Sequence, residues 1–151
     1  MPESNQVSIQ IPPEVLQEIQ TAVTNIQTKL APYLIALSPE ERHQIPKMSD
    51  KTTPFVEKTI SYTESNPQFA PPYMKADEMK IDFDAVQTLK TIFNPLNQLV
   101  SNLDDSIMLS GSEAYIGSLA YYNSVKLASK MDVPGAKPIC DDLKQRFPGR
   151  K

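Results

Sequence analysis

Glutamate and histidine at residues 40–43 form the first group of side chains that could do chemistry. Glu40 and His43 have the Glu-X-X-His spacing that places a carboxylate and an imidazole on one helix face in di-iron bundles. Such a site needs two of these motifs, and the chain contains a single histidine. Ser38 and Glu41 also have the spacing of a helix capping box. We therefore interpret residues 40–43 as the first turn of a solvated helix, and we expect no metal there.

An acidic group near the end of the longest apolar segment is the second candidate. Asp104 and Asp105 lie near an expected helix C-terminus, where the helix dipole disfavours negative charge, and Glu113 follows. Neighbouring carboxylates can share a hard cation such as Mg²⁺ or Ca²⁺. Another acidic cluster lies at an expected helix N-terminus, where negative charge is stabilised without a ligand; it consists of Asp77, Glu78, Asp82 and Asp84.

Tyrosines in the segment after Gly111 make the third candidate. Tyr115 and Tyr122 share one face of an expected helix, and Ser118 lies on the adjoining face. Phenol and hydroxyl groups along a groove can bind a small polar molecule or a partner helix. The alternative is that they lie at the edge of the core with their hydroxyls in water. The candidate ligand- or partner-binding residues are therefore Asp104, Asp105, Glu113, Tyr115, Ser118 and Tyr122.

No catalytic constellation is present in the sequence. Cys140 is the single cysteine, and two acidic residues follow it, so we expect inert packing there. The sequence contains no Gly-rich phosphate loop, no Gly-X-Ser-X-Gly elbow and no Cys-X-X-Cys pair. We predict no catalytic residue, no cofactor and no metal site, and the chain is not expected to be an enzyme.

Composition is that of an ordinary globular protein. The 151 residues are 40% hydrophobic and 22% charged, and the net charge of −3 gives no electrostatic attraction to nucleic acid. A single cysteine excludes an internal disulfide. The N-terminus lacks a basic flank with an apolar run, and no stretch approaches the roughly 18 apolar residues of a membrane span. We expect a cytoplasmic protein without nucleic-acid or membrane partners.

Apolar periodicity predicts the elements that would position these residues. The strongest signal, with alternating spacings of three and four, is a seam in an expected helix over residues 75–109: Val86, Leu89, Phe93, Leu96, Val100, Leu103 and Ile107. Pro95 is expected to kink this helix. A turn at residues 110–112 is expected to precede a fourth helix, with Ser112 as its N-cap. Because the seam is wide and Pro95 interrupts it, we expect the rest of the chain to cover it as core.

The remaining segments complete a bundle. Pro13 is expected to open a first long helix, a short helix follows the capping box, and a second long helix runs from about residue 50 to residue 66. A short helix is expected over residues 137–147. Residues 1–12 are expected to form an extended arm that lays Val7, Ile9 and Ile11 on the bundle. The predicted fold is all-α: a single domain over residues 13–151, arranged as a four-helix up-and-down bundle with a short C-terminal helix.

A resemblance can be stated on several short runs of sequence. They are Leu-Ser-Pro-Glu-Glu-Arg at 37–42, Phe-Val-Glu-Lys at 55–58, Gly-Ser-Glu-Ala-Tyr at 111–115, Leu-Ala-Tyr-Tyr-Asn-Ser-Val-Lys at 119–126, Val-Pro-Gly-Ala-Lys at 133–137 and Arg-Phe-Pro-Gly at 146–149. On these the chain resembles a family of uncharacterised bacterial all-helical proteins of similar length. The resemblance covers residues 13–149, and no established activity comes with it. One departure is Cys140, where an aromatic residue is expected.

Two functions are compatible with these observations. The first is a non-enzymatic binding or scaffold protein that acts through contacts with a protein partner or by self-association. The second is a bundle that binds a small ligand or metal through the carboxylates and tyrosines around residues 104–122.

Overall fold

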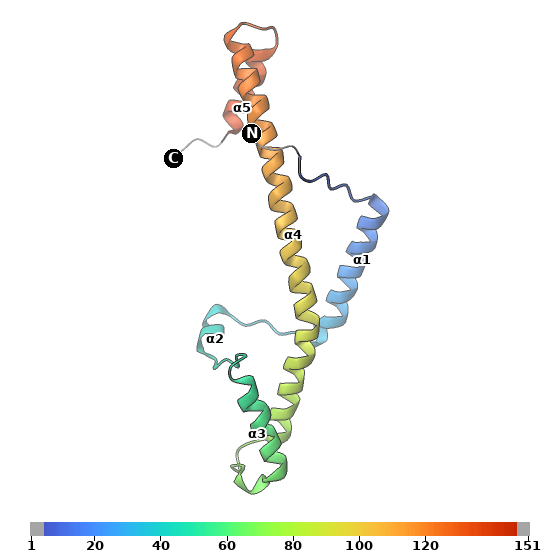
Figure 1. Cartoon of the computed structure of the whole chain (residues 1–151), viewed down its shortest axis with the longest axis vertical. Helices are drawn as coiled ribbons and strands as arrows, with labels where there is room; N and C mark the ends of the chain where they lie inside the picture. The colour runs from blue at the N-terminus through green and yellow to red at the C-terminus, as the bar shows by residue number, and fades with distance from the viewer. Residues whose placement is uncertain (1–4, 148–151) are drawn as a thin grey trace. The chain divides into compact units, whose positions relative to one another are not determined.

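The computed structural model describes residues 5–147, and every regular element in that range is helical (Figure 1). The helices are α1 (Pro13–Leu30), α2 (Pro39–Gln44), α3 (Thr53–Ser65), α4 (Ala76–Lys130) and α5 (Ala136–Arg146). Single 3₁₀ turns occupy Ala31–Tyr33 and Pro67–Phe69. The all-α prediction is confirmed. Residues 1–4 of the expected arm and residues 148–151 lie outside the described part of the chain.

Prolines and one capping box set most helix starts. Pro13 and Pro39 each occupy the first helical position, where the missing N–H costs nothing. At α2 the Glu41 N–H donates to Ser38 Oγ over 3.1 Å, and the Ser38 N–H donates to the Glu41 carboxylate over 2.7 Å. The predicted capping box is therefore confirmed. It satisfies two donors that a helix N-terminus would otherwise leave without partners.

The long helix α4 corrects a prediction. A turn was expected at residues 110–112, with Ser112 as N-cap, but α4 continues through these residues, as it does through Pro95. Glycine in a helix interior costs about 1 kcal/mol relative to alanine, and serine costs less. Ending a helix instead leaves several backbone carbonyls without intrahelical partners. The local cost of Gly111 is thus too small to end α4.

Burial is sparse throughout the described residues. Only Ile60, Val125 and Ala136 are buried between residues 5 and 147. The prediction that the α4 seam is core is wrong, because Val100 and Ile107 remain 62% and 69% exposed. Since the turn at 110–112 is absent, residues 113–130 extend the helix rather than fold back over residues 99–109.

The arm departs from expectation in a similar way. Residues 5–12 have no regular secondary structure, in keeping with an arm. Val7 is half-buried, whereas Ile9 and Ile11 are about half exposed, so the arm does not bury all three side chains. The arm is held at one point, where the Gln6 N–H donates to the Glu113 carboxylate.

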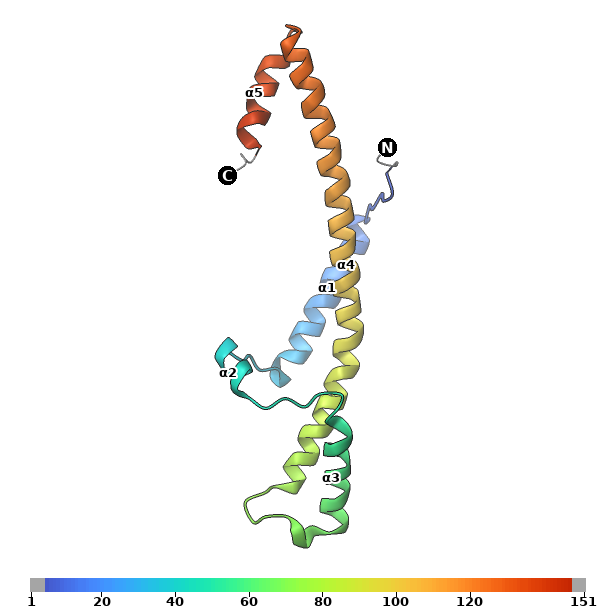
Figure 2. The ribbon, with the colours of Figure 1, turned by 60° about the vertical axis from the view of Figure 1, so that its left-hand side comes forward.

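Contacts divide the chain into two compact units, residues 11–98 and residues 1–10 with 99–151. In the first unit, α3 lies beside the start of α4, and Lys80 pairs with Glu64 over 3.1 Å (Figure 2). In the second, α5 lies beside the last turns of α4, and the rings of Tyr122 and Phe147 stack with centroids 6.0 Å apart. Each unit therefore contains a small helical hairpin: α3 with the start of α4 in the first unit, and the end of α4 with α5 in the second.

Candidate functional site

Three of the predicted site residues line one hollow where α5 lies against α4. Tyr115, Ser118 and Tyr122 come from α4, and the opposite wall comes from α5 and its end, with Leu143, Arg146 and Phe147. The volume is about 190 Å³, below the roughly 300–1,000 Å³ of small-molecule sites. A groove was one of the two interpretations of the tyrosine face, and α5 and its end lie opposite these residues.

Two of the polar side chains that line this hollow, Ser118 and Arg146, have hydrogen-bond partners in their own helices. The Ser118 hydroxyl donates to the Ala114 carbonyl over 2.8 Å, and Arg146 Nε donates to the Asp142 carboxylate over 3.1 Å. Lys126 Nζ lies 5.5 Å from the centre of the Tyr122 ring, within cation–π range. Each of these three contacts joins residues four apart in one helix, so they order the walls of the hollow, whereas the stacked rings of Tyr122 and Phe147 join one wall to the other. The sequence carried a signal for the second wall of the hollow, because apolar residues at helical spacing predicted the last helix.

The predicted carboxylates do not come together. Asp104 and Asp105 are exposed on successive positions of α4, while Glu113 is half-buried and accepts the Gln6 N–H. Within residues 5–147, no three His, Cys, Asp or Glu side chains are grouped so that they could hold a metal ion. Glu40 and His43 are exposed on α2, whose start is explained by its capping box.

The surface that sequence reasoning missed is apolar. On α4 the side chains of Val100, Leu103 and Ile107 are all more than half exposed, at helical spacings of three and four. The same side of the helix continues through Ser110 and Ala114. The sequence had identified this seam, but as core. Its exposure makes it a candidate contact surface.

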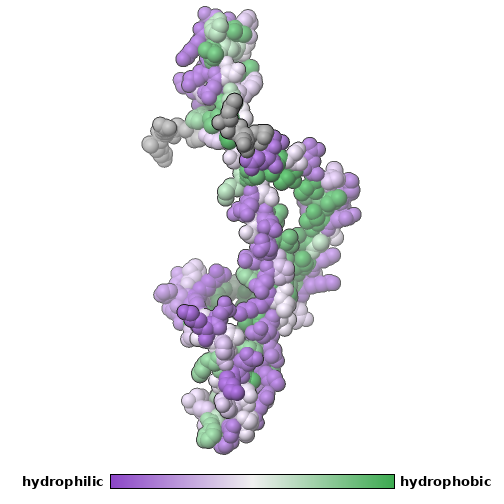
Figure 3. Space-filling view, in the orientation of Figure 1, coloured by the Kyte–Doolittle hydropathy of each residue, from purple (hydrophilic) through white to green (hydrophobic). Residues whose placement is uncertain are grey.

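A second apolar face lies on α1. Its members are between 39% and 49% exposed: Val15, Leu16, Ile19, Val23 and Ile26. Hydrophobic residues gather along this helix in the space-filling view (Figure 3). Near its end, Leu30 and Tyr33 face Leu89 and Ile92 of α4 across a hollow of about 470 Å³. The apolar face of α1 is therefore only partly packed within its own unit.

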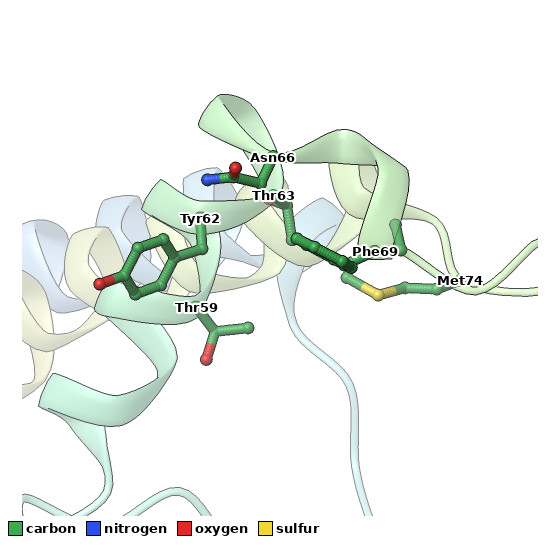
Figure 4. A pocket seen from close by; sticks show the side chains of 7 residues that line it. Thr59, Tyr62, Thr63, Asn66, Phe69 and Met74 are labelled. Carbon is green, nitrogen blue, oxygen red and sulfur yellow. The ribbon is translucent and has the colours of Figure 1, made fainter.

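A further hollow lies where α3 ends. Tyr62, Thr63 and Asn66 line it together with Phe69 and Met74 of the connection to α4, and its volume is about 370 Å³ (Figure 4). The Thr63 hydroxyl is occupied, because it donates to the Ile60 carbonyl over 2.7 Å. Phe69 remains 80% exposed beside the hollow. This surface too is apolar and lacks a charged group.

Lys80 has a shifted pKa, and the cause is a structural contact. The hydrogen bond and charge of Glu64 raise the pKa of Lys80 above the ordinary lysine value. This pair joins α3 to α4 and lies away from the tyrosine hollow.

Comparison with protein-family models, with curated proteins and with solved structures finds no match to this chain. None of the helices in the described part is long and apolar enough to cross a membrane. The interpretation of function therefore depends on the surfaces and contacts of the chain itself.

Proposed function

We propose that this chain is a non-enzymatic binding or scaffold protein that acts through protein–protein contacts. The observation that carries the proposal is the exposed apolar seam on α4, where Val100, Leu103 and Ile107 retain about 60–70% exposure. Apolar side chains in a continuous row on a helix are typical of a surface that another helix covers. The four-helix packing favoured by the sequence would then be completed by a partner.

The face of α1 supports the same function. Helix-in-groove recognition uses apolar anchors at spacings of three and four residues, as Ile19, Val23 and Ile26 provide. Binding of a cation or small ligand has less support, because the predicted carboxylates point to different sides of α4 and the tyrosine hollow is small.

Light scattering and a pull-down with the immobilised chain test the proposal. The double variant Ile19→Gln, Val23→Asn should lose partners that the unaltered chain retains, because it makes the α1 face polar. The control variant Gln17→Ala, Thr21→Ala changes the opposite side of α1 and should retain them. A chain that stays strictly monomeric and retains no protein at micromolar concentration would overturn the proposal.

A further inference from the structure

We propose that α4 pairs antiparallel with α4 of a second copy of this chain, with the two-fold axis at Ser110 and Gly111. The inference rests on the proposed function and names its partner. The contact surface is the exposed side of α4 between residues 100 and 121, which we call the central α4 face. Its members are Val100, Leu103, Ile107, Ser110, Gly111, Ala114, Ser118 and Tyr121.

The order of side-chain sizes along the central α4 face favours an antiparallel arrangement. Large apolar residues precede Ser110, and the small residues Ala114 and Ser118 follow it before Tyr121. An axis between residues 110 and 111 sets Ile107 opposite Ala114 and Leu103 opposite Ser118. Large residues facing small ones let two helices interdigitate. A parallel pair would instead place leucine against leucine and alanine against alanine, leaving a gap between the small residues.

The backbone at the proposed axis is open to close approach. A Cβ placed on Gly111 would meet no atom within 4 Å outside its own helix turn. The arm contacts Glu113, and α5 lies against the side of α4 that carries Tyr115 and Tyr122, with Ser118, which is still exposed, at the border between that side and the central α4 face. The contacts recorded within residues 99–147 thus leave the row formed by Val100, Leu103 and Ile107 exposed.

The positions of the charged residues also favour a two-fold axis at residues 110–111 over an axis within the apolar seam, for example at Leu103. Between Thr91 and Val125 the charged residues of α4 are Asp104, Asp105 and Glu113. An axis at residues 110–111 separates the two copies of Asp104 by about 20 Å along the helices, which exceeds the screening length of roughly 8–10 Å in ordinary salt. Glu113 of one copy then lies about 6 Å along the helices from Asp104 of the other, but on the opposite edge of the central α4 face. An axis at Leu103 would bring the two Asp104 carboxylates together.

Cysteine cross-linking tests both the partner and the axis. In a Cys140→Ser background, the single variants Ile107→Cys and Ala114→Cys are mixed at micromolar concentration and mildly oxidised. The mixture should give a covalent dimer, because residue 107 of one copy faces residue 114 of the other. Each variant alone should give little, since like residues would be about 10 Å apart along the helices. Ile116→Cys, on the opposite side of α4, replaces Ala114→Cys as the matched control.

Three results would overturn the inference. Strong cross-linking of Ile107→Cys alone would indicate another axis or a parallel pair. A disulfide within one chain of the Ile107→Cys, Ala114→Cys double variant, in a monomer, would show that α4 bends at residues 110–112. A monomeric unaltered chain in sedimentation equilibrium, at concentrations up to 100 times those of the cross-linking mixture, would exclude the second copy. If partners were still retained in the pull-down in that case, the proposed function would stand without this inference.

Discussion

Ile107→Gln on α4 gives the most direct quantitative test of the apolar surface. Ile107 is 69% exposed in the chain. Full burial of an isoleucine contributes about 1.5–3 kcal/mol, so covering its exposed part contributes about 1–2 kcal/mol. A two-fold dimer covers two such side chains, and each 1.4 kcal/mol is tenfold in Kd. The variant should therefore raise the dimer Kd by about 30- to 700-fold.

Sedimentation equilibrium over a dilution series measures this Kd, and circular dichroism of the same samples checks that the helix content is unchanged. Ile116→Gln is the control, because Ile116 is 47% exposed and lies nine residues further along α4, on the opposite side. Its Kd should stay within about twofold of the unaltered chain. The reasoning is refuted if Ile107→Gln dimerises as tightly as the unaltered chain, or if Ile116→Gln weakens the dimer equally.

Local features of the helices give four further predictions. Ser38→Ala should destabilise the first turn of α2 by about 0.5–2 kcal/mol through loss of its capping box, which amide hydrogen exchange of that turn would detect and unchanged protection would contradict. Gly117→Ala should raise the thermal midpoint, because a helical alanine is about 1 kcal/mol better than glycine and its Cβ meets nothing within 4 Å. Gly135→Ala should lower that midpoint, because its φ of 84° is left-handed and costs alanine about 1–2 kcal/mol. Since Glu64 raises the pKa of Lys80, the stability that this pair contributes is complete below the unfolded-state pKa of about 10.4 and is lost as pH rises through the folded-state pKa. The difference in thermal midpoint between the unaltered chain and Lys80→Met should therefore vanish in strongly alkaline buffer, and a difference that persists there would count against the pair.

Helix existence and most helix ends could be predicted from sequence. Pro13 and Pro39 opened α1 and α2 as expected, and the last helix was placed within one residue of Ala136–Arg146. These features depend on hydrogen bonds and caps between residues no more than four positions apart. The prediction of a turn at residues 110–112 was wrong because Gly111 changes the local free energy of the helix by only about 1 kcal/mol. The hydrogen bonds of the neighbouring helix turns outweigh this cost.

The candidate site was predictable in part. Helical spacing indicated that Tyr115 and Tyr122 share one face with Ser118 beside them, and all three line the hollow, but spacing did not reveal that Phe147 and Arg146 face them. The carboxylates at 104, 105 and 113 were grouped by nearness in sequence, and on a continuous helix they diverge, because successive residues differ in direction by about 100°.

The sequence by itself determined that the chain is helical and that residues 86–107 carry one apolar seam. Only the tertiary structure decided that much of this seam is exposed, and that α4 does not turn at residues 110–112. The physical reason is that periodicity specifies which side of a helix avoids water, whereas the surface that covers it comes from residues distant in the chain, or from another molecule. A seam of apolar residues therefore identifies a surface to be buried without identifying its partner.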